Sequence, residues 1–152
     1  MRHFIIQVKT TEIAPRHNLK CPKDSKYEEV EEPDKKIQQF LMWAHKTGLL
    51  AVWGPRRFVL SASAAPKFLT PRFAEFQGVV QALAAVSMDD FIAKDGMLQN
   101  LQNDLKYAIA APRPWYIALE GENEPMPFER FLRVAVPGQE YHIGGVVLTF
   151  ND

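Results

Sequence analysis

The fold is decided by residues 34–61, which read DKKIQQFLMWAHKTGLLAVWGPRRFVLS. The first half spaces its apolar positions as an amphipathic helix does, at i, i+3, i+4 and i+7. Asp34 is the expected N-cap of this helix, and Gly48 is its expected stop. The four apolar positions that predict the buried face are Ile37, Phe40, Leu41 and Ala44.

The second half of the same stretch predicts a β-hairpin. Residues 49–53 and 57–61 are rich in apolar and β-branched side chains, and the Gly54-Pro55 dipeptide between them is a turn signal. Arg56 and Arg57 follow the turn directly, so both are expected to project beside the hairpin tip.

Working outward, alternation of apolar residues predicts a strand before this stretch and further elements after it. Thr70 caps the next helix and Pro71 suits its first position. The elements expected outside residues 34–61 are a strand at 4–9, helices at 70–86, 87–96 and 98–109, and strands at 115–120, 131–136, 139–143 and 146–150, with a bulge at Gly144-Gly145.

The order of these elements predicts an α+β fold. Its first part follows the β-α-β-β-α-β order of a split βαβ, or ferredoxin-like, sheet. The additional helices and the last strands would then be additions to that plan, the strands forming a C-terminal β extension, and a related α/β sandwich is the alternative. We expect residues 1–152 to form a single domain with a long polar loop at about 11–33.

Composition predicts an ordinary globular protein in a reducing compartment. The 152 residues are 47% hydrophobic and 24% charged, with no net charge. Cys21 is the single cysteine, so no internal disulfide is possible. No apolar run approaches the ~20 residues of a membrane span, and the first residues enter a strand pattern without a secretory leader, which predicts a cytoplasmic location and no membrane association.

Motifs for catalysis and for cofactors are fragmentary. Phosphate-binding glycine loops, the G-x-S-x-G elbow and His-Glu-x-x-His are all missing from the sequence, so we predict no cofactor and no metal. His142, two residues after Glu140, is a weak candidate for general acid–base work. His45 with Thr47 forms half of a two-histidine motif, and Cys21 lies between two lysines; a helix-end histidine and an incidental thiol are the alternatives.

Charge is unevenly distributed along the chain. The net charge is +4 over residues 1–26, −5 over 27–34, +7 over 35–72 and −6 over 73–152. The stretch 35–72 contains no acid, and it also carries aromatic residues. Interleaved basic and aromatic side chains can hold a polyanion, whereas a solvated basic face over an aromatic core is the structural alternative. The acidic cluster before it could also fold back and neutralise it.

These patterns predict a non-enzymatic binding or adaptor domain that presents residues 35–72 to an anionic partner, either nucleic acid, a nucleoprotein complex or an acidic protein surface. One alternative is a small RNA- or phosphoester-processing enzyme that uses His142 or His45, and another is a structural or oligomerising protein; a homo-oligomer is compatible with each. The residues predicted to contact the partner are Arg56, Arg57, Trp53, Lys46, Lys67 and Arg72.

Overall fold

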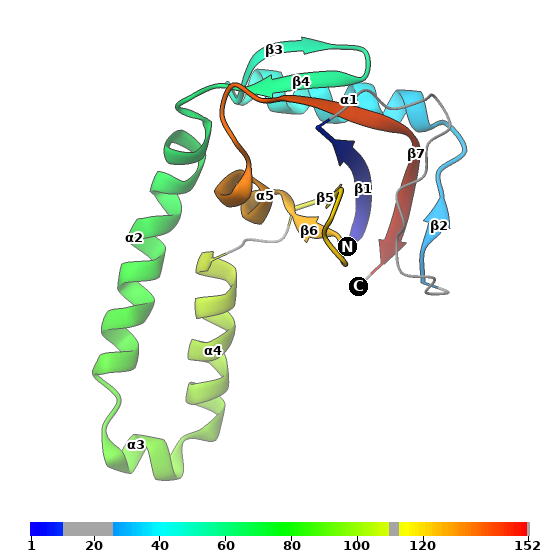
Figure 1. Ribbon diagram of the computed structural model, residues 1–152. Coiled ribbons are helices and arrows are strands. Elements are labelled where there is room, and N and C mark those ends of the chain that lie inside the picture. The colour runs from blue at the N-terminus through cyan, green and yellow to red at the C-terminus, as the bar shows by residue number, and fades with distance from the viewer. Residues whose placement is uncertain (11–25, 110–112, 152) are drawn as a thin grey trace. The chain divides into compact units, whose positions relative to one another are not determined.

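The computed structural model describes residues 1–10, 26–109 and 113–151, and it has a mixed α+β fold (Figure 1). The chain divides into two compact units. The first, here called the sheet unit, comprises Met1–Ala65 and Arg113–Asp152, and the second, the helical unit, comprises Pro66–Pro112. No helix of the described residues is long and apolar enough to cross a membrane.

The sheet unit is built on a curled seven-stranded sheet in the order β3-β4-β7-β1-β5-β6, with β2 also paired to β7 (Figure 1). β7 runs antiparallel to β1, β2 and β4, and β1 runs parallel to β5. The last strand of the chain therefore lies at the centre of the sheet. The strands are β1 (Arg2–Lys9), β2 (Glu28–Glu29), β3 (Leu50–Gly54), β4 (Arg57–Leu60), β5 (Trp115–Leu119), β6 (Met126–Pro127) and β7 (Glu140–Asn151).

The α+β class is confirmed, but the ferredoxin-like arrangement is not. A split βαβ sheet would set the second hairpin strand beside the first strand of the chain. Instead β7 lies between β4 and β1. The expected strands at 139–143 and 146–150 form this one continuous strand, and the predicted irregularity at Gly144-Gly145 is present, because the β1–β7 register shifts there.

Two helices belong to the sheet unit, α1 (Pro33–Lys46) and α5 (Phe128–Val134). α1 packs against β7 and buries the four apolar residues that the sequence predicts. Phe40, which is fully buried, is the centre of the core that lies between this helix and the sheet. Its ring lies 5.9 Å from Phe58, 5.6 Å from Trp115 and 5.8 Å from Phe128, measured between centroids.

The strand expected at 131–136 is wrong, because this segment belongs to helix α5 and the turn after it. Phe128, Phe131 and Leu132 are buried at a helical spacing. Val134 and Val136, which a strand would have turned inward with Leu132, are 51% and 59% exposed. The alternation of apolar residues in this segment therefore does not mark a strand.

The helical unit consists of most of α2 (Ala64–Ala84), then α3 (Met88–Ala93) and α4 (Asp95–Ile109). α2 begins six residues before the expected cap at Thr70, so Pro71 lies inside the helix. The Thr70 hydroxyl donates a hydrogen bond to the carbonyl of Pro66 within the helix. Ala108 is the one buried residue among 66–109, and Val80 and Leu83 on α2 are 43% and 38% exposed.

The long loop predicted at about 11–33 is described only from residue 26 onward. In that part, Glu28 and Glu29 form strand β2 on the edge of β7, and Pro33 already begins α1. Residues 11–25, which include Cys21, lie outside the described residues.

Candidate functional site

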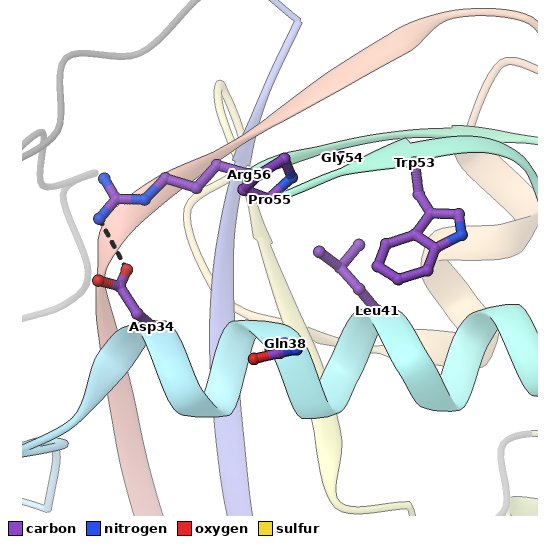
Figure 2. Close-up of a pocket in the computed structure, with 7 residues that line it drawn as sticks. All are labelled: Asp34, Gln38, Leu41, Trp53, Gly54, Pro55 and Arg56. Atoms are coloured by element: carbon purple, nitrogen blue, oxygen red, sulfur yellow. Dashed lines mark hydrogen bonds and ion pairs between the residues drawn. The ribbon is translucent and has the colours of Figure 1, made fainter.

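A cleft of about 540 Å³ lies between α1 and the turn of the β3–β4 hairpin (Figure 2). We call it the hairpin cleft. Three of its residues come from one face of α1 at the spacing i, i+4, i+7, and the other four form the end of β3 and the turn. The lining residues are Asp34, Gln38, Leu41, Trp53, Gly54, Pro55 and Arg56.

The inner part of the hairpin cleft is apolar. Leu41 is almost fully buried, whereas the side chain of Trp53, which faces it in Figure 2, is 39% exposed. β3 is an edge strand of the sheet, and its residues 51–53 are all exposed. Among the described residues, no further strand therefore covers the indole of Trp53 on that side. The rings of Trp53 and His45 lie 5.5 Å apart. The cleft therefore combines an accessible aromatic surface with an aliphatic floor.

The charged end of the hairpin cleft is an ion pair between Arg56 and Asp34. The guanidinium Nη2 lies 2.7 Å from the carboxylate Oδ1 (Figure 2). The Arg56 side chain is 35% exposed and the Asp34 side chain is 75% exposed. The sequence predicts Asp34 as the N-cap of α1, and this prediction is wrong. The helix begins at Pro33, and Glu32 is the residue that precedes it. Asp34 instead stands in the first turn, where its side chain reaches the hairpin.

Arg57 points to a different neighbour. Its Nη1 lies 3.1 Å from Oε1 of Glu140 on β7. A Cβ added at Gly54, the residue that pairs with Arg57, would lie 2.9 Å from Nε of Arg57, so glycine leaves room for this side chain. The two adjacent arginines therefore have different neighbours. Arg56 lines the cleft, whereas Arg57 forms an ion pair between β4 and β7.

The other predicted contact residues do not line the hairpin cleft. Lys46 is exposed in the last turn of α1. Lys67 and Arg72 lie on α2 in the helical unit, and Arg72 forms an ion pair of 3.0 Å with Glu75. Lys46 shares the sheet unit with Arg56, whereas Lys67 and Arg72 belong to the helical unit.

The basic stretch is partly neutralised by acids, as one of the sequence alternatives expected. Four of the seven basic residues between 35 and 72 have a carboxylate oxygen within 4.0 Å among the residues that the structure describes. Two of those carboxylates, Glu32 and Asp34, come from the acidic cluster at residues 27–34. The pairs are Lys35–Glu32, Arg56–Asp34, Arg57–Glu140 and Arg72–Glu75.

The two candidate histidines, His142 and His45, make contacts that are common for structural residues. His142 lies opposite Arg57 on the adjacent strand, and its Nε2 is 3.8 Å from Oε1 of Glu140. His45 is exposed in the last turn of α1, and Thr47, the second half of its motif, donates a hydrogen bond of 2.6 Å to the carbonyl of Trp43. Within the described part of the chain, no three His, Cys, Asp or Glu residues are grouped as metal ligands.

Of the residues predicted to contact a partner, Trp53 and Arg56 line the hairpin cleft, whereas the α1 wall of the cleft was not predicted. The missed signal was the spacing of Asp34, Gln38 and Leu41, which places one acidic, one amide and one aliphatic side chain along one face of α1.

No family model, no curated protein and no solved structure matches this chain.

Proposed function

We propose that this chain is a non-enzymatic binding or adaptor domain and that its hairpin cleft accepts an acidic segment of a partner protein. An apolar side chain of that segment would lie against Trp53 and Pro55, and a neighbouring carboxylate would bind Arg56. The observation that carries the proposal is the presence of a half-exposed tryptophan and an arginine in one cleft of about 540 Å³.

The side chains of the hairpin cleft are of the type that contributes most to protein interfaces. Tryptophan and arginine are enriched among residues whose truncation weakens binding most, and such residues lie in pockets that exclude water on binding. Trp53 offers a large rigid surface, and the exposed ring of Pro55 extends it. Burial of an apolar side chain against them favours association by about 25 cal/mol for each Å² of apolar surface removed from water.

The ion pair with Asp34 defines how the partner's carboxylate would bind. A guanidinium can hold a carboxylate through two parallel hydrogen bonds, and Asp34 now holds Arg56 through one short contact. Because Asp34 is 75% exposed, its carboxylate can turn to water at small cost. We expect the incoming carboxylate to replace that of Asp34.

The pattern of ion pairs favours a protein partner over nucleic acid. Binding to a phosphate backbone depends on a run of Lys and Arg that releases counterions from several phosphates. Here carboxylates stand beside Arg56 and Arg57, and the hairpin region carries alternating signs of charge. Such a surface suits a segment that has a small number of carboxylates in defined positions. The single cysteine supports the cytoplasm as the place of this interaction.

Selection from a displayed peptide library, followed by calorimetric titration of the selected peptides, tests the proposal. We expect selected sequences to contain an aromatic or long aliphatic residue next to Asp or Glu. Arg56→Ala should weaken their binding about 10- to 150-fold, the loss that follows from removing a charged hydrogen bond worth roughly 1.5–3 kcal/mol.

Arg57→Ala is the matched control, because it removes the adjacent arginine outside the lining of the cleft. We expect it to leave peptide affinity within about twofold, since a surface substitution usually changes free energies by less than 0.5 kcal/mol. Equal losses for the two variants would contradict the assignment of the cleft. Tight binding of single-stranded oligonucleotides, with a salt slope of about −0.7 per phosphate contact, would favour the nucleic-acid interpretation instead.

A further inference from the structure

The outer side of β3 is an open edge of the sheet. β3 pairs with β4 on one side, and no strand among the described residues pairs with its other side. The other edge strands, β2 and β6, have two residues each, whereas β3 has five. Because an edge strand presents unpaired amide and carbonyl groups, it is a template on which a further strand can pair. β3 is the longest such template in this sheet.

The turn of the hairpin fixes which backbone groups of β3 face the open edge. The turn has two residues, so Gly54 and Arg57 form the last pair of the hairpin, and such a turn closes on a hydrogen-bonded pair. Hydrogen-bonded and non-hydrogen-bonded pairs alternate along an antiparallel ladder, so the next pair, Trp53 and Phe58, is non-hydrogen-bonded. The amide and the carbonyl of Trp53 therefore point away from β4, toward the open edge.

The pairing of β4 with β7 agrees with this alternation. The Ile143 amide donates a hydrogen bond of 2.8 Å to the carbonyl of Arg56, on the β7 side of the hairpin. Two residues further along, the backbone of Phe58 faces the same side and pairs with Tyr141 of β7. The backbone groups of Phe58 are thus directed to β7, and those of its neighbour Trp53 are directed to the open edge.

Trp53 joins this open edge to the hairpin cleft. Its backbone faces the edge, and its indole lines the cleft on the side of α1 (Figure 2). A strand added to β3 would place every second side chain on the same face of the sheet as the indole. A segment paired with the edge can therefore fill the cleft with its side chains.

We propose that the acidic segment binds as a short strand that runs antiparallel to β3 and exchanges two hydrogen bonds with Trp53. This inference rests on the proposed function and adds the conformation and direction of the bound segment. The segment residue opposite Trp53 would accept a hydrogen bond from the Trp53 amide and donate one to the Trp53 carbonyl. The antiparallel direction lets a single residue of the segment bond both groups, which a parallel strand cannot do. In such complexes backbone hydrogen bonds supply affinity and alternate side chains supply specificity.

The direction of the strand determines where the segment carries its carboxylate. β3 ends at Gly54, and Arg56 lies in the turn beyond this end. An antiparallel segment passes the turn with its amino-terminal part. The acidic residue that binds Arg56 must therefore precede the apolar residue that lies against Trp53. In a parallel segment the acidic residue would follow the apolar residue.

A second copy of this chain suits the edge less well. If the β3 strands of two copies paired, neither strand would offer a carboxylate to Arg56 of the other, because Leu50–Gly54 contain no charged residue. The edge also has features that limit pairing between copies, since Pro55 follows it and the β3–β4 register shifts between Leu50 and Val52. An acidic segment of a few residues fits both the charge and the length of this edge.

Two singly N-methylated forms of one selected peptide test the strand. Methylation of the apolar residue opposite Trp53 removes the amide that would donate to the Trp53 carbonyl. By calorimetric titration, we expect the affinity to fall at least about fivefold, because that carbonyl loses its donor. Methylation of the next residue is the matched control. Its amide would point away from β3, so the affinity should stay within about twofold.

Amide hydrogen exchange of the protein gives a second measurement. At a saturating concentration of the unmodified peptide, we expect exchange of the Trp53 amide to slow at least about tenfold, because the amide gains an acceptor. The Val52 amide faces β4 by the same alternation, so its exchange should not change through pairing with the peptide.

The outcomes separate the strand from the proposed function. Equal affinities of the two methylated peptides, or unchanged exchange at Trp53, would overturn the strand even where Arg56→Ala still weakens binding and the proposed function stands. Acidic residues that follow the apolar residue in the selected peptides would contradict the antiparallel direction. Peptides that bind equally to the native chain and to Arg56→Ala would overturn both proposals. Protection of the Trp53 amide that rises with protein concentration, without peptide, would assign the edge to a second copy.

Discussion

The proposed function makes Asp34 a competitor of the incoming carboxylate for Arg56, so replacement of Asp34 should move stability and affinity in opposite directions. In the unbound protein the pair is 2.7 Å long, and Asp34 is 75% exposed. Double-mutant measurements on pairs of that exposure give about 0.2–1 kcal/mol. Asp34→Asn should therefore lower the free energy of unfolding by no more than about 1 kcal/mol.

The same substitution should strengthen binding of an acidic peptide. Asparagine keeps the size of the side chain but removes the charge that holds Arg56, so the peptide carboxylate no longer displaces a competitor. The same free energy, about 0.2–1 kcal/mol, corresponds to a gain in affinity of about 1.4- to 5-fold. Chemical denaturation and calorimetric titration of one preparation give the two quantities together.

The Arg56→Ala background provides the control for this competition. Asp34→Asn should change the peptide affinity of Arg56→Ala much less than it changes that of the native sequence, because Asp34 then no longer competes for a guanidinium. A loss of affinity on Asp34→Asn in the native background would refute the reasoning, since it would mean that the carboxylate itself contacts the peptide.

Three further predictions concern the fold. Phe40→Ala should lower the free energy of unfolding by about 3–5 kcal/mol, measured by denaturant titration, because the ring is fully buried among other rings. Pro71→Ala should raise the thermal stability of α2, by up to about 3 kcal/mol, since alanine supplies the missing amide donor and favours a helix interior; a lower melting temperature by circular dichroism would contradict this. Hydrogen bonds from Lys94 and Ser87 lower the pKa of Asp90 below its ordinary value of 3.8. The stabilisation of α3 by Asp90 should thus be complete above that value and lost as the pH falls through the lowered pKa, which amide chemical shifts of α3 during an acid titration will show.

The sequence predicts local elements well where one periodicity is unambiguous. α1 and the β3–β4 hairpin were expected within a few residues of their observed bounds, because the buried face of α1 and the Gly54-Pro55 turn are encoded within one short stretch. α5 was missed because Leu132, Val134 and Val136 alternate like a strand, and the decisive contact of Phe131 with Tyr141 comes from a later strand.

Long-range pairing limited the prediction of the site. The contact of Arg57 with Glu140 joins residues 83 positions apart, and it exists because β7 enters the sheet beside β4. The insertion of the last strand at the centre of the sheet leaves no trace in local periodicity. By contrast, the Arg56–Asp34 pair spans 22 residues within the stretch that forms α1 and the hairpin, so the acidic cluster could be suspected from charge alone.

Mapping by nuclear magnetic resonance tests the hairpin cleft most directly. A selected acidic peptide is titrated into the ¹⁵N-labelled chain, and the backbone amides and the tryptophan indole N–H groups are followed. We expect the largest shifts at Trp53, at Arg56 and along the first three turns of α1. Shifts confined to the helical unit or to the β4–β7 pair around His142, with Trp53 unmoved, would contradict binding in the hairpin cleft.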